Sequence, residues 1–501
     1  MHYMEFPVTF YKMNLMMIII LLLTIIPTLK ADFNGYEVDA IKGEFMIGFE
    51  KCDEEIIKLI ENNGFEIIRN IDQINASLVR SRHDVSAQDC LTALTQISGI
   101  RYVEPNYVVN IMPWSIMTSI NTSELNAPLR MGTSAYPNDP LWASDPSTGH
   151  GQWNMRVIRA NDAWNITAGS HDVVVAVIDS GVFWRNPDLE ANYVPTGYDW
   201  VNNDSDPNDD YGHGSWTAGI IAARTNNGYG VAGIAQVSIM AEKVVDRNGQ
   251  GSVENAARGI IHAADAGADI LSMSFGTNSF SWALKDAVDY ALSRGCTLVA
   301  AAGNFNTSFP HYPAALEGVI AVASTYGEPV DVRAPYSNHA SWITLSAPGG
   351  FDANGNGRAD DGEYWVVSTS NSVNVFYMAT GTSASAPHVA GLASLYKSAH
   401  PSATNDNIRE ALIRTCDDKG DPGWDEFYGY GRINALSALT EPGIVSVGGK
   451  AVMLSPDPEN TYVFSINDIL IIVLIVILSS FIVGSAALGI KRLNNKLSKL
   501  R

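Results

Sequence analysis

Two patterns of apolar residues cover most of the chain, and the first spans residues 36–111. Apolar and polar residues alternate in YEVDAIKGEFMIGFE, whereas apolar residues take helical spacing in CDEEIIKLIENNGF and SAQDCLTALTQIS. Together with the strand-like segments FEIIRNI, NASLVRS and RYVEPNYVVNI, they predict the order strand, helix, strand, strand, helix, strand. This order is typical of a split βαβ, ferredoxin-like module. An ordinary accessory α/β domain is the alternative.

The second pattern begins near residue 136 and continues to about residue 440. Its strands are almost wholly apolar, as in VVVAVID, DILSMSFG, CTLVAAAGN and GVIAVAST, and helical stretches separate them. Strands without a polar face are buried on both sides, so the pattern predicts a mainly parallel sheet covered by helices on both faces. Residues 113–135 and 441–465 are predicted to be a linker and a short stalk, because neither shows a sustained period.

Apolar segments near both ends of the chain predict a membrane-anchored protein. Leu15–Ile26 follows Lys12 and is typical of a secretory signal, so residues 1–31 are predicted to be a signal peptide, with an uncleaved anchor as the alternative. Residues 469–490 carry no charge and span about 33 Å as a helix, which is enough to cross a bilayer. We therefore expect a transmembrane helix at 466–490, a cytoplasmic basic tail at 491–501, and everything before the helix outside the cell.

The composition limits the classes of function. The chain has 53 acidic and 32 basic residues and a formal net charge of −21, so a nucleic-acid-binding surface is not expected. The acidity indicates either a well-solvated secreted surface or carboxylate clusters that hold calcium. Four cysteines are too few for a disulfide scaffold. The pairs Cys52/Cys90 and Cys296/Cys416 stay open as disulfides, although Cys296 also fits a small buried hydrophobic residue.

Three candidate catalytic residues occur in the order Asp, His, Ser. Asp179 ends the strand VVVAVID, His213 opens a predicted helix in YGHGSWTAGIIAA, and Ser383 lies at a helix start in GTSASAPHVAG. A serine hydroxyl needs an imidazole to take its proton and a carboxylate to orient that imidazole. We expect Ser383 to be the nucleophile, His213 the general base and then acid, and Asp179 the orienting carboxylate. A lipase or esterase is excluded, because GTSAS lacks the last glycine of G-x-S-x-G and the order is different.

With their flanking residues, these three segments resemble the subtilisin-like serine proteases, the subtilases, over about residues 136–440. The resemblance implies an α/β protein with the subtilisin-like three-layer fold and a mainly parallel sheet. It also implies that the ferredoxin-like module, residues 32–112, is an inhibitory propeptide, because Val103-Glu-Pro-Asn106 is similar to the ending of subtilase propeptides. Autoprocessing is then expected in the linker at 113–135. The predicted fold class adds a single transmembrane helix after the catalytic domain.

The same resemblance implies further site residues. Asn304, in Ala-Ala-Gly-Asn, is expected to donate its side-chain amide to the oxyanion, beside the backbone N–H of Ser383. The segments expected to flank the substrate as extra strands and to line the primary pocket are Ser274, Phe275 and Gly276, Gly249 and Gly251, and Ala301, Ala302 and Gly303. The family usually has Thr-His after His-Gly, whereas Ser215-Trp216 stands here, which changes a neighbour of His213.

The loop 352–363 matches the spacing of oxygen ligands in an EF-hand calcium loop. The expected ligands are Asp352, Asn354, Asn356, Arg358 through its carbonyl, Asp360 and Glu363. A hydrophilic hairpin without calcium is the alternative.

Two more structural calcium sites are implied by the resemblance. One would use Asp199, Asp204 and Asp206, with Asn202 and Asn208 as further candidates. The other would use Asp188, the side chain of Asn227 and the carbonyls of Thr225, Tyr229 and Val231. A cation that binds only the folded chain stabilises it. No Cys/His cluster in the sequence supports zinc.

Together these features predict a membrane-anchored extracellular serine endopeptidase, made as a zymogen and acting through an acyl-enzyme intermediate. Its expected partners are peptide or protein substrates, its own propeptide as inhibitor, and the membrane through the C-terminal helix. Two alternatives remain, a processing protease that cleaves surface proteins at defined sites and a catalytically silent surface binding module.

Overall fold

A computed structural model describes residues 39–84, 86–111, 115–121, 137–143, 151–328, 331–352, 364–441, 443–447, 450–454 and 462–463. The chain separates into two compact units, residues 1–40 and 41–501. The elements below belong to the second unit, except that the first strand begins at Ala40. The predicted signal peptide lies outside the described residues.

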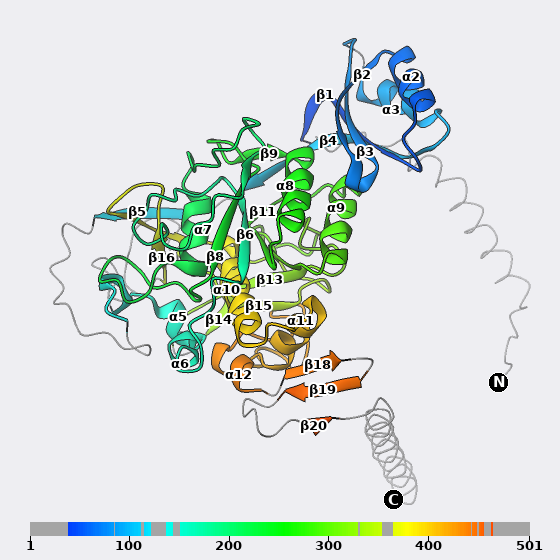
Figure 1. Ribbon diagram of the computed structural model, residues 1–501. Coiled ribbons are helices and arrows are strands. Elements are labelled where there is room, and N and C mark those ends of the chain that lie inside the picture. The colour runs from blue at the N-terminus through cyan, green and yellow to red at the C-terminus, as the bar shows by residue number, and fades with distance from the viewer. Residues whose placement is uncertain are drawn as a thin grey trace, which may run out of the picture. The chain divides into compact units, whose positions relative to one another are not determined.

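The N-terminal module is a four-stranded sheet with two helices, and its elements follow the order predicted from the sequence. They are β1 (Ala40–Phe49), α2 (Glu54–Asn62), β2 (Phe65–Ile71), a 3-10 turn (Asp72–Ile74), β3 (Ala76–Ser81), α3 (Ala87–Thr95) and β4 (Ile100–Ile111), with strand order β4-β1-β3-β2 (Figure 1). Both helices begin at a side-chain cap, because Asp53 accepts the N–H of Ile56 and Ser86 accepts that of Asp89. Their apolar faces cover one side of the sheet.

All four cysteines are described, and all are free thiols. Neither of the two disulfides left open by the sequence is therefore formed. Cys90 and Cys296 are each 2% exposed, and Cys90 packs in the core of the N-terminal module. Cys296 is buried, as expected for a small hydrophobic residue.

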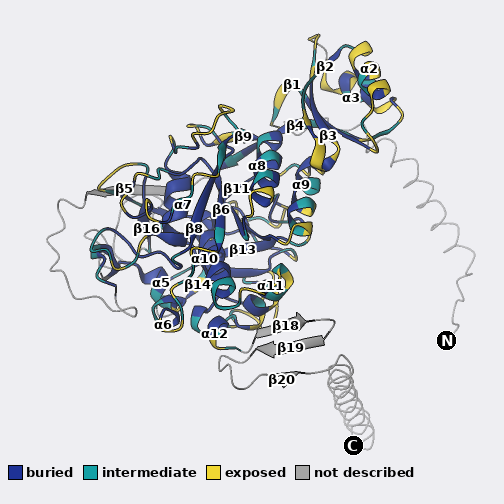
Figure 2. Ribbon diagram, viewed as in Figure 1, coloured by how far each residue is buried: buried dark blue, intermediate teal, exposed yellow. Residues whose placement is uncertain are grey.

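A mainly parallel sheet forms the centre of the large domain. Its strands are β6 (Val174–Asp179), β7 (Tyr198–Asp199), β8 (Ser238–Lys243), β10 (Ile270–Met273), β12 (Thr297–Ala301), β13 (Ile320–Tyr326), β14 (Val332–Arg333) and β15 (Leu345–Pro348). They lie in the order β14-β13-β12-β10-β6-β8-β7, with β15 also on β13, and only the β13–β14 pair is antiparallel. The inner strands are buried on both faces, which explains their continuous apolar sequences (Figure 2).

Two layers of helices cover this sheet. Helices α8 (Val253–Asp265) and α9 (Trp282–Ser293) pack together against β6, β8 and β12, whereas α7 (His213–Ala222) and α10 (Thr382–Ala399) pack together from the other layer (Figure 1). Helix α7 is buried at every residue, and α10 is buried from Thr382 to Tyr396 (Figure 2). The remaining helices are short or peripheral: α4 (Pro140–Ala143), α5 (Trp153–Val157), α6 (Ala160–Ala163), α11 (Asn405–Arg414) and α12 (Ala435–Thr440).

Three small groups of strands complete the fold. Strands β9 (Gln250–Ser252) and β11 (Phe275–Gly276) both pair with β4 of the N-terminal module. Strands β16 (Val366–Thr369), β17 (Val375–Thr380) and β5 (Ser115–Asn121) form an antiparallel sheet. Where the sequence predicted a stalk, the backbone forms β18 (Gly443–Val447), β19 (Lys450–Leu454) and β20 (Tyr462–Val463).

The membrane-spanning part of the predicted fold class is wrong and is corrected here. Among the described residues, no helix combines the length and the apolar character needed to cross a bilayer. The segment predicted to do so, residues 466–490, lies outside them, as does the predicted cytoplasmic tail. An uncharged sequence run satisfies the length criterion for a membrane helix without establishing that a helix forms. The described residues form the predicted α/β fold with a mainly parallel sheet, preceded by the N-terminal module.

Candidate active site

The three candidate catalytic residues lie at the ends of elements that meet at one edge of the sheet. Asp179 is the last residue of β6, His213 the first of α7, and Ser383 the second of α10. Both carboxylate oxygens of Asp179 lie close to Nδ1 of His213, at 2.8 and 2.9 Å. The hydroxyl of Ser383 donates to the carbonyl oxygen of Ser274 at 3.3 Å. All three side chains are at most 1% exposed.

The pairing of Asp179 with His213 selects one tautomer of the imidazole. A carboxylate can only accept, so Nδ1 carries the proton and Nε2 is the basic nitrogen. The N–H of Ser180 donates to Asp179 Oδ1 at 2.7 Å and fixes the carboxylate from the other side. An imidazole held in this way can take a proton at Nε2, and the carboxylate stabilises the resulting cation.

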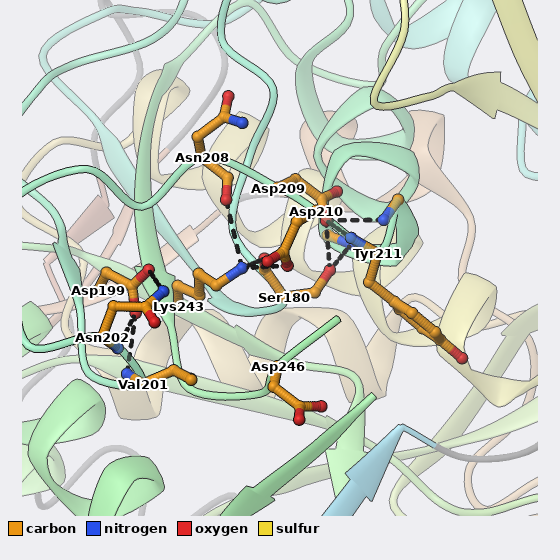
Figure 3. Close-up of polar contacts among 12 residues, drawn as sticks. Ser180, Asp199, Val201, Asn202, Asn208, Asp209, Asp210, Tyr211, Lys243 and Asp246 are labelled. Carbon is orange, nitrogen blue, oxygen red and sulfur yellow. Dashed lines mark hydrogen bonds and ion pairs between the residues drawn. The ribbon is translucent and has the colours of Figure 1, made fainter. Parts of the chain in front are cut away.

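Asp209 anchors the start of the helix that carries His213, and sequence reasoning missed it. Its carboxylate is fully buried and accepts the hydroxyls of Ser180 (2.9 Å) and Ser215 (2.6 Å) (Figure 3). It also accepts the backbone N–H groups of Tyr211 (3.0 Å), Gly212 (2.7 Å) and Ser215 (2.8 Å). Burial raises the pKa of this carboxyl, although the accepted hydrogen bonds oppose the shift. The only signal in the sequence was its place four residues before His213.

Lys243 contacts the turn after Asp179 through its ammonium, and it is only 1% exposed (Figure 3). It ends β8 directly beside Asp179 in the parallel register. Its ammonium donates to the carbonyl oxygens of Ser180 and Asn208, both at 3.3 Å, and it pairs with Asp210. A buried ammonium is tolerated where its protons are satisfied, so this lysine ties the turn after Asp179 to the loop before His213.

The departure at Ser215-Trp216 changes packing around His213. The ring of Trp216 lies 5.9 Å from the imidazole, tilted by 49°, and its indole N–H donates to the carbonyl of Val366 at 3.2 Å. Trp216 is fully buried. The tryptophan therefore packs against the imidazole and leaves the Asp179–His213 pair intact.

Asn304 is held against the start of α10. Its Oδ1 accepts the backbone N–H of Thr382 at 2.9 Å and the hydroxyl of Thr382 at 2.8 Å. The amide nitrogen therefore faces the other way, and a Cβ at Gly381 would lie 2.9 Å from it. Gly381 has φ +148°, so glycine is needed here both for the backbone and for this close approach. The arrangement brings an amide donor beside the start of α10, where the helix dipole favours negative charge.

The segments predicted to flank a substrate do flank an extended strand, namely β4. Ile111 pairs with Phe275 and Asn110 with Gly276, while Val109 pairs with Gly251. The N–H of Ile111 donates to the carbonyl oxygen of Gly249 at 2.8 Å. Strand β4 thus lies between β9 and β11 as a peptide would. The side chain of Phe275 is fully buried, so it packs inward.

Ala301 is the last residue of β12, and Ala302 and Gly303 follow it. Sequence reasoning missed His311, whose imidazole lies close to both Gly276 and Gly303. A Cβ at Gly276 would lie 2.2 Å from Nε2 of His311, and one at Gly303 would lie 3.5 Å from its Cδ2. His311 Nδ1 bonds Oδ1 of Asn278 at 2.9 Å, which makes Nε2 the acceptor. Nε2 has no hydrogen-bond partner among the described residues. Burial lowers the pKa of His311 to about 4, so the imidazole is neutral at neutral pH.

Glu104, in the Val103-Glu-Pro-Asn106 segment, caps a helix of the large domain. Its carboxylate accepts the hydroxyl of Ser281 (2.6 Å) and the N–H groups of Trp282 (2.8 Å) and Ala283 (3.0 Å) at the start of α9. A carboxylate at a helix N-terminus satisfies free donors and interacts favourably with the helix dipole. Burial raises the pKa of Glu104, because only 5% of the residue is exposed.

Other contacts attach the N-terminal module at the neighbouring helix. Asn106 Oδ1 accepts the N–H of Glu254 at 3.1 Å, near the start of α8. The guanidinium of Arg69 pairs with Glu254 at 2.8 Å, and that of Arg101 pairs with Asp286 at 2.8 Å. The N-terminal module therefore contacts the large domain through β4 and through two helix starts.

One predicted calcium set gathers around buried carboxylates. Asp188 is fully buried; its Oδ1 accepts the amide of Asn227 at 2.7 Å and its Oδ2 the N–H of Val231 at 3.0 Å. Asp139, which sequence reasoning missed, accepts the N–H groups of Asn226 and Asn227 at 2.9 and 3.2 Å. Burial raises the pKa of Asp139 to about 6 and that of Asp188 well above its usual range, with Asp139 contributing. Asp139 lacked a signal because it lies far from this loop in the sequence.

Thr225 and Tyr229, the other predicted ligands of the Asp188 site, lie in the same loop as Asn227 and Val231.

The ligands of the other predicted site, Asp199, Asp204 and Asp206, are gathered less closely than those of the Asp188 site. Asp199 is buried, and its oxygens accept the N–H groups of Val201 and Asn202 and the Asn202 amide, at 2.8–2.9 Å (Figure 3). Asp204 and Asp206 are exposed, and Asp204 accepts the N–H of Asp206.

In the EF-hand-like loop, Asp352 is the only described residue; Asn354, Asn356, Arg358, Asp360 and Glu363 lie outside the described part of the chain. Over the residues that the structure describes, no three His, Cys, Asp or Glu side chains are grouped so that they could hold a metal ion. Among the described residues of the predicted metal sites, only Asp188 has a second buried carboxylate near it, that of Asp139.

Comparison with known sequences and structures gives consistent matches. Residues 170–431 match the subtilase family, and residues 28–106 match the fervidolysin N-terminal prodomain. The chain is 33% identical to the thermophilic serine proteinase of Bacillus sp. strain AK1 over 77% of its length and 95% of the relative's. It is 39% identical to thermitase of Thermoactinomyces vulgaris over 60% of its length and 99% of the relative's. The crystal structure of fervidolysin from Fervidobacterium pennivorans superposes with a TM-score of 0.66 and 25% identity, covering 83% of this chain and 63% of that one.

Proposed function

Because the chain belongs to the subtilase family and is a serine endopeptidase with an N-terminal prodomain, we propose that Asp179, His213 and Ser383 are its catalytic triad. The resemblance inferred from the sequence is thereby confirmed at the level of the family and the enzyme class. The observation that carries the assignment of residues is the paired contact of both Asp179 oxygens with His213 Nδ1 at 2.8 and 2.9 Å.

In this proposal Ser383 Oγ attacks the carbonyl carbon of the scissile bond while His213 Nε2 takes its proton. The imidazolium is stabilised by Asp179, whose own orientation depends on the N–H of Ser180. His213 then returns the proton to the leaving amine, which leaves an acyl-enzyme on Ser383. Water, activated by the same imidazole, hydrolyses this ester and restores the hydroxyl.

We assign oxyanion stabilisation to the side-chain amide of Asn304 and the N–H of Ser383. Thr382 supports this assignment, because it binds Oδ1 of Asn304 twice and so directs the amide nitrogen away from itself. A preorganised donor costs no reorganisation as charge develops on the substrate oxygen. Strands β9 and β11, with Ala301, Ala302 and Gly303, are assigned to the non-primed side of the substrate and the primary pocket.

The proposed site of action is outside the cell. Two relatives are named a minor extracellular protease, from Bacillus subtilis, and a halolysin-like extracellular serine protease, from Natrialba magadii, and they are 36% identical to this chain over 60% and 62% of its length. The prediction of a single-pass protein anchored in the cell membrane is withdrawn, because it depended on the transmembrane helix corrected above.

We propose one structural calcium site, at Asp188. The fit rests on two buried carboxylates, Asp188 and Asp139, whose burial raises their pKa values and so disfavours their charged forms. A hard cation favours carboxylate and carbonyl oxygens, and the residues that would hold it are these two with Asn227, Thr225, Tyr229 and Val231. When bound, it would neutralise buried charge and close the loop 225–231. It has no part in the proton transfers.

The test uses the full chain expressed as the parent, as Ser383→Ala and as Ser385→Ala. Ser385 is the matched control, because it is buried in the same helix and its hydroxyl has no partner among the described residues. We expect the parent and Ser385→Ala to release the prodomain and cleave casein in calcium buffer, and Ser383→Ala to do neither. Gel analysis and mass spectrometry measure both. A Ser383→Ala chain that still processes itself would refute the assignment of the nucleophile.

A further inference from the structure

Asn338 is an asparagine whose side chain holds the chain on both sides of Asn304. It is fully buried, and its amide nitrogen Nδ2 donates to the carbonyl oxygen of Ala302 at 2.9 Å. Its Oδ1 accepts the backbone N–H groups of Phe305 at 2.9 Å and of Thr307 at 3.3 Å. These bonds reach residues before and after Asn304, so one side chain spans the turn that presents the proposed oxyanion donor.

The backbone around Asn338 fastens the same turn, residues 302–307. The N–H of Asn338 donates to the carbonyl oxygen of Gly303 at 2.9 Å, and the N–H of Asn306 donates to the carbonyl oxygen of Tyr336 at 2.8 Å. Gly303 has φ +109°, and a Cβ there would lie 2.2 Å from Nδ2 of Asn338. The amide of Asn338 therefore packs directly against the backbone of the turn, which a side chain at residue 303 would prevent.

Thr382 holds Asn304 from the other side. The hydroxyl of Thr382 accepts the N–H of Gly303 at 3.0 Å and donates to Oδ1 of Asn304 at 2.8 Å. Thr382 thus fixes the rotation of the Asn304 amide, whereas Asn338 fixes the backbone from which that amide extends. Both matter, because an oxyanion donor acts over about 2.7–3.1 Å and loses much of its effect when it is displaced by about 1 Å.

We propose that Asn338 is a positioning residue of the oxyanion hole, which sets the place of the Asn304 amide relative to the carbonyl that Ser383 attacks. The inference rests on the proposed function, because it needs Asn304 to be the oxyanion donor. The three hydrogen bonds of the Asn338 side chain described above end within three residues of Asn304. Asn338 therefore acts on catalysis through the backbone of residues 302–307 and by way of Asn304.

Removal of the Asn338 side chain should affect the transition state more than the bound substrate. Asn338→Ala leaves two buried N–H groups and one carbonyl without these partners, and the turn relieves this cost by moving toward other partners. Negative charge on the substrate oxygen develops only in the transition state, so a misplaced Asn304 amide lowers kcat and leaves KM almost unchanged. Loss of one oxyanion donor typically lowers kcat by about a hundredfold to a thousandfold. A donor that is present but displaced should cost less, about tenfold to a hundredfold.

The experiment measures kcat and KM of the self-processed enzyme for one internally quenched peptide, in the parent, Asn338→Ala, Asn304→Ala and the double variant. Asn338→Ala should lower kcat by about tenfold to a hundredfold and change KM by less than about threefold. In the Asn304→Ala background the same substitution should lower kcat by less than about threefold, because residues that act as one unit are not additive. The same fall in kcat with and without the Asn304 amide would overturn the proposal, since Asn338 would then act by another route.

Asn434→Ala is the matched control for a loss of stability. Asn434 is also a buried asparagine with both ends of its amide in use, because Nδ2 donates to Asp417 at 2.9 Å and Oδ1 accepts the N–H of Ser437 at 3.0 Å. This variant should lower the Tm, measured in Ser383→Ala chains, and leave kcat as in the parent. If Asn434→Ala lowers kcat as far as Asn338→Ala does, the effect is one of general stability and the proposal is refuted.

Asn338→Asp decides the question if the alanine variant does not fold. It keeps the oxygen that Phe305 and Thr307 bind, and it replaces the donor to Ala302 with a carboxylate oxygen. A protonated carboxyl can donate to that carbonyl again, so kcat relative to the parent at the same pH should rise as the pH falls from about 8 to about 5. A ratio that does not change with pH would overturn the proposal.

The outcomes separate this inference from the proposed function. If Asn304→Ala leaves kcat unchanged, the assignment of the oxyanion donor fails, and the positioning role fails with it. If Asn304→Ala lowers kcat and Asn338→Ala does not, only the positioning role is refuted.

Discussion

Replacing Asp209 by asparagine tests whether the buried network in Figure 3 holds the catalytic helix in place. An asparagine has the same shape but only one accepting oxygen, whereas Asp209 accepts five hydrogen bonds. If the oxygen stays at the Oδ1 position, the amide faces the N–H of Ser215, which then lacks an acceptor. If the amide nitrogen takes the Oδ1 position instead, the backbone N–H groups of Tyr211 and Gly212 both lose their acceptor.

The first orientation is the less costly one, and its cost can be worked out. One buried N–H left without a partner costs about 1–3 kcal/mol, and the remaining bonds lose the strengthening that a charged acceptor provides. The asparagine gains because no charge is buried, consistent with the raised pKa of Asp209. The net expectation is a loss of about 2–4 kcal/mol in the free energy of unfolding. Because Asp209 binds Ser180 beside Asp179, kcat is expected to fall as well.

The stability assay is thermal unfolding in the Ser383→Ala chain, which prevents self-digestion, and kcat is measured in chains that retain Ser383. Asp210→Asn is the matched control, because it makes the same chemical change at the next residue. The Asp210 side chain is 47% exposed, and an asparagine there keeps an oxygen for the buried Lys243 ammonium although it removes the opposite charge, so a smaller loss of Tm than in Asp209→Asn is expected. Equal losses of Tm in the two variants, or an unchanged Tm and kcat in Asp209→Asn, would refute the anchoring role.

Three further predictions concern calcium, the primary pocket and pH. Chelation of calcium should lower the Tm of the Ser383→Ala chain, and Asp188→Asn should abolish most of this dependence; an equal chelation effect in both chains would contradict the site. His311→Gly removes the imidazole between Gly276 and Gly303, so cleavage of a peptide library should shift toward larger residues before the cut, and an unchanged profile would place His311 outside the pocket. The hydrogen bond to Glu242 raises the pKa of His262 above its usual value of about 6.5. The contribution of this hydrogen bond to the stability of the fold is therefore complete below a pH of about 6.5, and it is lost as the pH rises through the pKa of His262 in the folded chain. His262→Gln should flatten the fall in Tm between pH 6 and pH 9, measured in the Ser383→Ala chain; a slope equal to that of the parent would assign the titration to another group.

Residue pattern and order along the chain were sufficient for the order of the principal elements, the family and the enzyme class. Continuous apolar strands such as Val174–Asp179 need cover on both faces, so the sequence alone predicts a parallel sheet between helices. The order Asp179, His213, Ser383 with its flanking residues points to one protease family. Local patterns of this kind determine local structure, because they act through neighbours a few residues away.

Other features depend on residues that only folding brings together. Asp139 joins Asp188 across a long sequence interval, and His311 comes to lie between Gly276 and Gly303, so neither has a local motif. The docking of β4 and β5 beside Ser383 was decided by the tertiary structure too. An extended chain can pair with any open edge, and only the position of β11 and β17 selects which one.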